Sequence, residues 1–123
     1  METSSAVAAL SALAQENRLD IFRLLVQAGP QGMAAGDVAE RLKIPPATLS
    51  FHLAQLRHAG LLTMRRQGRS LIYSADYDGM NELMAFLTEN CCGGAATVGC
   101  TVPVCDPASA TIVRRKSRGA TRQ

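Results

Sequence analysis

Apolar residues recur at intervals of three and four along the first 60 residues, and this spacing predicts amphipathic helices. A first helix is expected to begin after Ser4 or Ser5. A second is expected to begin after the capping residue Asn17 and to stop at Gly29-Pro30. The residues expected to face the core are Val7, Leu10, Leu13 and Ala14 in the first helix and Leu19, Phe22, Leu25 and Val26 in the second.

A short turn that contains proline separates the next two expected helices. The earlier one covers Ala35–Leu42, with Val38, Ala39 and Leu42 turned inward. It ends at Ile44, because a residue before proline is pushed out of the helical region. The later one runs from Pro46 to about His58 and closes at Gly60. Its buried stripe is Leu49, Leu53 and Leu56, and its opposite face holds Ala47, Thr48, Phe51, Gln55 and His58, flanked by Ser50 and His52.

The pattern changes after Gly60 and predicts a two-stranded hairpin followed by a last helix. Leu61–Arg66 and Ser70–Ser74 are rich in strand-forming residues and are separated by Gln67-Gly68-Arg69. Asp76 is expected to cap a helix from Tyr77 to about Asn90. Its apolar positions cover more than one stripe, which indicates one face on its own domain and one on another chain; they are Met80, Leu83, Met84, Phe86 and Leu87.

Composition divides the chain into three parts. With 123 residues and 47% apolar residues, the chain has the size of one compact domain, expected over residues 1–92. A cysteine-bearing loop follows over residues 93–105, and residues 106–123 are expected to form a disordered basic tail. No apolar run reaches the roughly 18–20 residues needed to span a bilayer, and Met1–Ala9 lacks the features of a secretory signal. We therefore expect a cytoplasmic protein with no membrane partner.

Charge is concentrated in the middle of the chain. The net charge is only +3, but residues 41–75 hold six basic residues and no acid. Such a block is typical of a surface that faces a polyanion, although a solvated basic face is the simpler interpretation.

Three helices followed by a basic hairpin predict a mainly α fold with a small β-hairpin, the winged helix-turn-helix. In that fold the helix at residues 46–58 enters the major groove of double-stranded DNA and the hairpin lies along the backbone. Short side chains let the helix approach base edges, and Phe51 could pack on a thymine methyl group. The expected DNA contacts are Thr48, Ser50, Phe51, His52, Gln55, Arg57, Arg65, Arg66 and Arg69. The alternative is that Ser50 and His52 only flank the core and that the hairpin arginines are solvated.

Four cysteines lie within 15 residues after the last helix: Cys91, Cys92, Cys100 and Cys105. In a reducing cytosol they are first read as ligands or redox thiols. Gly93-Gly94 allows the helix end to fray, so that three thiolates could converge without an imidazole. Such a site suits a thiophilic ion such as trivalent arsenic, As(III), or antimony, Sb(III). The alternatives are a structural zinc site, a thiol redox switch, unused thiols and, as the weakest, a thiol-dependent enzyme, for which no base lies beside the cysteines.

Three strings resemble the ArsR/SmtB metalloregulatory repressors over about residues 6–92. They are Leu13-Ala14 with Arg18-Leu19-Asp20-Ile21-Phe22, the run Leu49-Ser50-Phe51-His52-Leu53-Ala54-Gln55-Leu56 with Ala59-Gly60-Leu61-Leu62, and Gln67-Gly68-Arg69 with Ile72-Tyr73. The resemblance implies a homodimer joined by its first and last helices, and a repressor that leaves its operator when an inducer binds. Asn17 stands where many members have proline, and the third helix lacks the cysteine-containing metal box of many arsenic sensors.

The junction Asn90-Cys91-Cys92-Gly93 also resembles an arsenic-responsive branch whose inducer site is a vicinal cysteine pair plus one downstream cysteine. The resemblance implies Cys91, Cys92 and Cys100 as ligands, with Cys105 as the alternative third ligand. The inducer it implies is arsenite, with antimonite or methylarsenite as further possibilities. A redox- or zinc-responsive repressor that uses the same cysteines is the alternative function.

Overall fold

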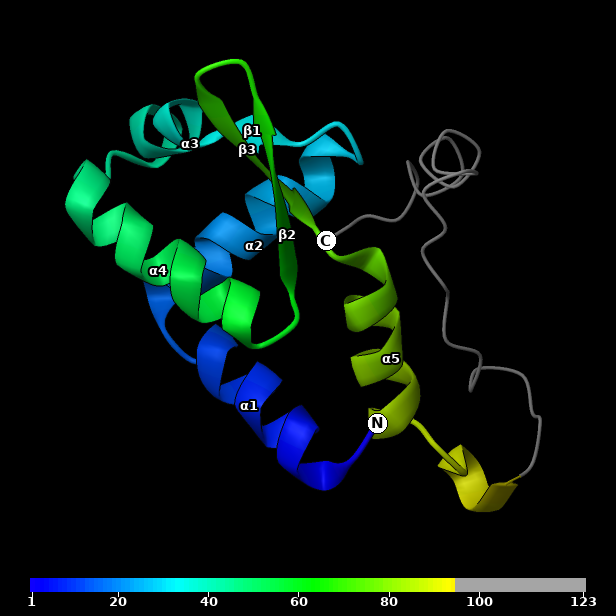
Figure 1. The fold of residues 1–123 in the computed structure, drawn as a ribbon. Helices are drawn as coiled ribbons and strands as arrows, with labels where there is room; N and C mark the ends of the chain where they lie inside the picture. Colours follow the sequence, from blue (N-terminus) through cyan, green and yellow to red (C-terminus); the bar gives the residue numbers. More distant parts are fainter. Residues whose placement is uncertain (95–123) are drawn as a thin grey trace, which may run out of the picture.

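The computed structural model describes residues 1–94 of the chain, and its elements follow the predicted order closely (Figure 1). The elements are α1 (Thr3–Leu13), α2 (Glu16–Ala28), β1 (Met33–Ala34), α3 (Ala35–Leu42), α4 (Pro46–His58), β2 (Leu62–Gln67), β3 (Ser70–Ala75), α5 (Tyr77–Leu87) and the 3-10 turn η1 (Cys91–Gly94). The predicted mainly α fold with a small hairpin is therefore confirmed. The expectations for residues 95–123, including Cys100, Cys105 and the tail, lie outside the described residues.

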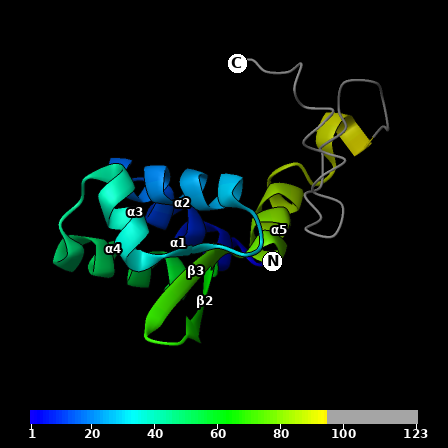
Figure 2. The same cartoon turned by 90° about the horizontal axis from the view of Figure 1, so that it is seen from above.

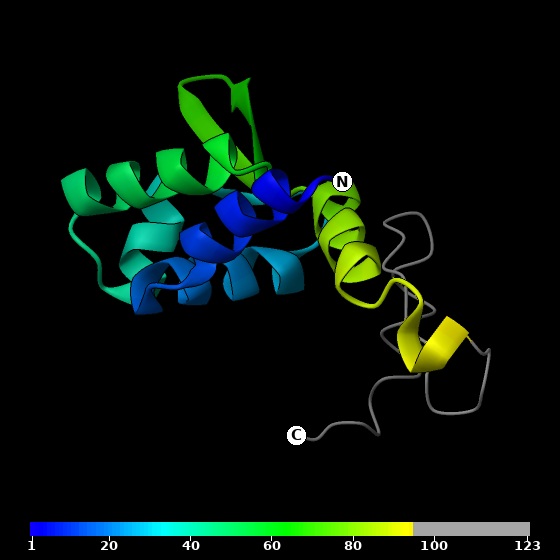
Figure 3. The same cartoon turned by 90° about the horizontal axis from the view of Figure 1, so that it is seen from below.

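The helices α1 to α4 form the body of the molecule, and the hairpin projects from it. Figures 2 and 3 both show the hairpin leaving the body on the side where α4 lies. In the same views α5 lies at one end of the body, beside the N-terminus and away from the connection between α3 and α4. The hairpin and α4 thus share one side of the molecule, whereas α5 forms a separate end.

The hairpin belongs to a three-stranded antiparallel sheet in the order β1-β3-β2. The short strand β1 was not predicted, because its two residues pair with β3 across a long sequence separation, with Met33 opposite Tyr73. Gln67 pairs with Ser70, so the turn has two residues and not the three that were expected.

The core lies between α2, α4 and the sheet. The predicted leucine stripe of α4 is confirmed, since Leu49, Leu53 and Leu56 are at most 2% exposed. Val38 of α3 is fully buried, as predicted, while Ala39 and Leu42 are half-buried beside it. These contacts set the rotation of α4 about its own axis.

The predicted inner faces of the first two helices were partly wrong. In α1 the buried residues are Ala6, Ala9 and Ala12, while Val7 and Leu10 are 55% and 43% exposed. Alanine faces let two helices approach closely, which leaves the larger apolar side chains on the outer side of α1. Ala14 lies beyond the end of the helix and is exposed.

The second helix begins earlier than expected. Gln15, and not Asn17, caps α2, because the Gln15 side chain accepts a hydrogen bond from the Arg18 backbone N–H at 2.9 Å. Ile21 is fully buried, whereas Leu19, expected to face the core, is 43% exposed.

The last helix begins as predicted and ends early. The Asp76 carboxylate accepts from the Gly79 backbone N–H at 3.0 Å, which confirms the cap. The helix stops at Leu87 rather than near Asn90, and Asn90 has a positive φ of 57°. Gly79 packs so closely on Gly60 that a Cβ atom there would clash with the Gly60 carbonyl oxygen. No helix within the described part of the chain has the length and apolarity needed to cross a membrane.

Candidate nucleic-acid interface

The outer face of α4 is a row of short polar side chains around one aromatic ring. Thr48, Ser50 and Gln55 are exposed, and Phe51 is 58% exposed. The buried leucines on the opposite face hold this row outward, and Pro46 suits the first position of the helix because it has no N–H group to leave unpaired. A rigid helix that presents small polar groups and one apolar ring can approach base edges in a major groove.

His52 does not belong to that row. The side chain is 7% exposed, and its Nδ1 lies 3.3 Å from Arg18 Nη1. A guanidinium only donates hydrogen bonds, so Nδ1 is the acceptor and the imidazole is neutral. Burial, and then the charge of Arg18, lower the pKa of His52 below its usual value. The prediction that His52 contacts bases therefore disagrees with its position, since one flank of α4 is covered by α2.

Arg18 is a positioning residue that the sequence interpretation missed. Its Nε donates to the Ala12 carbonyl oxygen at 2.7 Å, so one side chain joins the end of α1 to α4 through His52. Arg18 and His52 are 34 positions apart, and no local pattern signals a contact over that separation.

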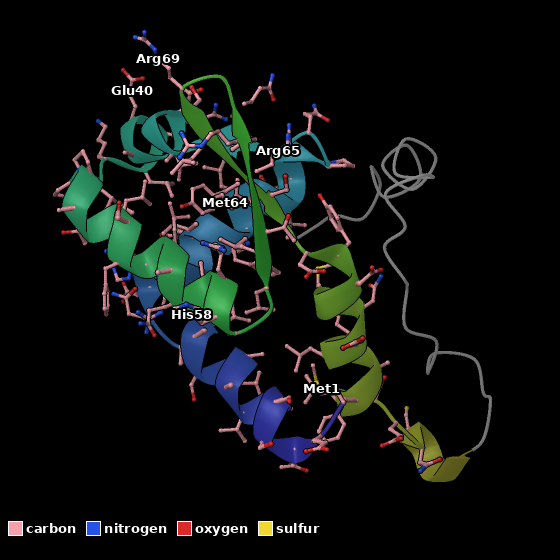
Figure 4. All side chains as sticks on the ribbon, viewed as in Figure 1. Met1, Glu40, His58, Met64, Arg65 and Arg69 are labelled. Carbon is pink, nitrogen blue, oxygen red and sulfur yellow. The ribbon has the colours of Figure 1, made fainter. Side chains whose placement is uncertain are left out.

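All three hairpin arginines are exposed, but one of them, Arg65, is held by hydrogen bonds to its own chain (Figure 4). Arg65 donates to the Gln31 carbonyl oxygen at 2.8 Å and lies 3.5 Å from Ser74 Oγ, which itself donates to the Pro30 carbonyl oxygen. Arg65 thus ties the hairpin formed by β2 and β3, which is the wing of the fold, to the loop before β1. Arg66 lies on the other face of β2, since side chains alternate along a strand, and Arg69 lies in the turn. Both are exposed and able to meet phosphates.

Arg57 extends from the last turn of α4 towards the wing. Its Nη1 lies 4.0 Å from the Met64 sulfur, and the side chain is exposed. Arg57, Arg66 and Arg69 therefore lie on the two elements that share one side of the body, and residues 41–75 bring no carboxylate to it. The predicted basic surface is consistent with this arrangement, which would attract a polyanion.

Comparison with known proteins gives the family. A family described as a helix-turn-helix domain matches residues 13–65. The transcriptional activator HlyU of Vibrio cholerae is 33% identical over 85 residues, which cover 67% of this chain and 76% of HlyU. The structure of HlyU from Vibrio cholerae N16961 matches with a TM-score of 0.56, covering 71% of this chain and 97% of that chain.

A third match indicates the family to which these regulators belong. An ArsR-like transcriptional regulator from Rhodococcus sp. RHA1 has a structure that matches with a TM-score of 0.61 at 26% identity, covering 68% of this chain and 76% of that chain. The chain belongs to the ArsR family of winged helix-turn-helix transcriptional regulators. The putative arsenical resistance operon repressor ArsR of Halobacterium salinarum is 35% identical over 79 residues, 64% of this chain and 60% of that protein. These relatives are all named as regulators of transcription or as operon repressors.

The first two cysteines of this ArsR-family regulator follow the end of α5 after three residues. Cys91 and Cys92 begin the turn η1, and Cys91 is half-buried. Asn90 and Gly93, on either side of the pair, have positive φ values of 57° and 73°. Among the side chains that the structure describes, no three His, Cys, Asp or Glu are grouped to hold an ion. Of the predicted inducer ligands, only the vicinal pair lies in the part of the chain that the structure describes.

Proposed function

We propose that this regulator is a homodimeric DNA-binding transcriptional repressor that leaves its operator when As(III) binds its cysteines. The observation that carries the proposal is the position of Cys91-Cys92, in a turn that follows the last residues of α5. An ion held there acts on the helix that has the least contact with its own chain.

Double-stranded operator DNA is the ligand that the α4 side of the molecule fits. Thr48, Ser50, Phe51 and Gln55 face outward on one rigid helix, and Arg57, Arg66 and Arg69 flank them. Side chains of this size read base edges, while arginines at the rim meet phosphates without reading sequence.

A second copy of the chain fits the apolar surface on α1 and α5. Val7 and Leu10 of α1 and Leu87 of α5 are each more than 40% exposed, and the two helices touch. Exposed large apolar side chains on adjacent helices are typical of an interface. A two-fold dimer would present two α4 helices to half-sites about one duplex turn apart.

Soft thiolates make As(III) the inducer of choice, with Sb(III) as a second candidate. Cys91 and Cys92 would supply two sulfurs, and Cys100 the third, with Cys105 as the alternative. The similarity to a protein named as a putative arsenical resistance operon repressor supports this inducer class. HlyU is named an activator, so the direction of regulation is part of the proposal.

The fold contains a short route from α5 to α4. The Asp76 N–H donates to the Leu61 carbonyl oxygen at 2.9 Å, and Gly79 packs on Gly60. Both contacts join the first turn of α5 to the residues that follow α4. A change in the crossing of two α5 helices would therefore alter the separation of the two α4 helices, which the operator requires to be fixed.

The test is binding of a labelled operator duplex with arsenite, zinc or peroxide, on the wild type and the four single Cys→Ser variants. We expect arsenite to lower wild-type affinity about 100-fold, which corresponds to about 2.7 kcal/mol of coupling. Cys91→Ser and Cys92→Ser should bind the operator and fail to release it, and a reporter gene should stay repressed.

The variants also separate the alternatives. Cys105→Ser should respond normally if Cys100 is the third ligand, and the opposite result exchanges their roles. Release by peroxide or zinc alone would replace the arsenic proposal with the redox or zinc alternative. If all four variants release DNA like the wild type, the cysteines have no part in sensing.

A further inference from the structure

A small hollow lies between the ends of α1 and α4, beside the face of α4 that is proposed to read bases. It has a volume of about 270 Å³ and is lined by Ala8, Ser11, Ala12, Arg18, Gln55, His58 and Ala59. Figure 4 places His58 at the end of α4 that adjoins α1. Gln55 belongs both to this lining and to the outer row of α4, so the hollow continues the α4 surface.

The chemistry of the lining favours an anion. The polar side chains are one guanidinium, one imidazole, one amide and one hydroxyl, all able to donate hydrogen bonds, and the lining has no carboxylate. Three alanines leave room for a ligand to approach these donors.

Arg18 is held in place for such a role. Its Nε is bound to the Ala12 carbonyl oxygen and its Nη1 contacts His52, while Nη2 has no hydrogen-bond partner among the described residues. Two contacts thus fix the guanidinium plane, and the remaining donors are available to an oxygen ligand. A preorganised arginine loses little conformational entropy when it binds a phosphate.

The hollow is large enough for a phosphate group. Its volume is about 270 Å³, just below the roughly 300 Å³ at which sites for drug-sized molecules usually begin, and its hydrogen-bond donors favour an anionic group. A helix about 10–12 Å wide fills a major groove about 12 Å wide, so the sugar-phosphate strands must pass close to its sides.

We infer that this hollow, which we name the α1–α4 hollow, binds one phosphodiester of the operator backbone in each half-site, through Arg18, His58 and Ser11. The inference rests on the proposed binding of DNA and adds to it a contact outside α4 and the wing. It gives α1 two roles, since its outer face is proposed to join the dimer and its last turns to hold DNA.

The test uses the full chain and a series of operator duplexes, each with one phosphate replaced by a neutral methylphosphonate. In the wild type, one position per half-site should lower affinity about tenfold through loss of a charge-assisted hydrogen bond. The same position should have no effect in Ala8→Glu, which places a carboxylate in the hollow, and a smaller effect in His58→Ala, which keeps Arg18. Ala8→Glu should also reduce the slope of log affinity against log salt concentration by about the amount that one phosphate contact contributes.

The matched control is Thr3→Glu, which adds the same charge to an exposed position of α1, five residues earlier and turned about 140° away. It should keep the wild-type pattern. Arg18 is not varied, because its loss would also release His52.

Two results would overturn the inference. The first is a methylphosphonate pattern that is the same in the wild type, Ala8→Glu and His58→Ala. The second concerns inorganic phosphate, tested as a competitor of operator binding against chloride at equal ionic strength. If phosphate competes in the wild type and not in Ala8→Glu, while no backbone position depends on the hollow, the site takes a free anion. Neither result affects release by arsenite, so failure here is distinct from failure of the proposed function.

Discussion

Apolar residues make up six of the 13 positions of α4 and seven of the 11 positions of α5, but the helix that is richer in them is the less buried one. In α4 four residues are buried, and the helix packs on α1, α2, α3 and β2. In α5 only Tyr77 and Leu83 are buried, Leu87 is 56% exposed, and α1 is its main helical neighbour. The chain itself therefore packs α4 on several elements and α5 on few. This difference separates the helix that is proposed to read DNA from the helix that is proposed to join the dimer interface.

The largest expected effect is on α4. Leu56→Ala removes a fully buried side chain and should lower the free energy of unfolding by about 2–5 kcal/mol. Leu87→Ala, the matched change in α5, should cost the isolated chain about 0.5 kcal/mol or less, because surface changes rarely cost more. Denaturation at low protein concentration measures both values. Similar losses in the two variants would remove the distinction between the helices.

Dimer formation should depend more on the exposed residues of α5 than on the buried residues of α4. Leu87→Glu combined with Val7→Glu places charges on the exposed apolar surface and should shift the mass from about 26 kDa, twice the 13.1 kDa chain, towards the monomer. Leu83 is avoided because it is 6% exposed, and a charge there would destabilise the chain itself. Sedimentation equilibrium measures the mass. A wild-type monomer that represses transcription would contradict the dimer.

The outer row of α4 should affect specificity without affecting stability. Gln55→Ala should weaken binding to the operator by about 1–3 kcal/mol, because a hydrogen-bonding group facing the bases is lost, and leave unfolding unchanged. The control is Arg69→Ala in the wing, which should weaken binding to all duplexes and lower the salt slope by about one. Fluorescence anisotropy with operator and random duplexes gives both numbers. Equal losses on both duplexes for Gln55→Ala would move this residue to the backbone contacts.

The smallest expected effect is a dependence of the melting temperature on pH, which arises from His52 on the flank of α4. The pKa of His52 is lowered from the usual 6.5, first by burial and then by Arg18, so below about pH 6.5 the unfolded chain binds more protons than the folded chain. The melting temperature should therefore fall as the pH decreases from 6.5 to the folded pKa, and His52→Gln should reduce this fall. Thermal denaturation between about pH 5.5 and 7.5 tests it. The same slope in both proteins would assign the effect to other groups.

The sequence predicted the elements whose limits depend on local chemistry. Pro46 begins α4, Asp76 caps α5, and the leucine spacing of α4 gives its buried face. The errors arose where a choice depended on tertiary packing. In α1 the alanine face is buried and Val7 is exposed, which the helical period alone does not distinguish.

The candidate site was predicted to a similar extent. Thr48, Ser50, Phe51 and Gln55 face outward as expected, because a polar stripe opposite a leucine stripe is legible in the sequence. His52 and Arg65 carry side chains typical of DNA contacts, but each is held by a partner 34 residues away. Such partners depend on how the chain folds back on itself, and no nearby residue signals them.

The contact between Gly60 and Gly79 offers a way to interpret related sequences that lack structures. The two glycines are required for different reasons: Gly60 has a φ of 82° with open space beside it, while Gly79 has an ordinary helical backbone and no room for a Cβ atom. A relative with alanine or a larger residue at the position of Gly79 must hold its last helix farther from the turn that follows α4. That one position would then distinguish regulators in which the two helices are closely coupled from those in which the signal must take another route.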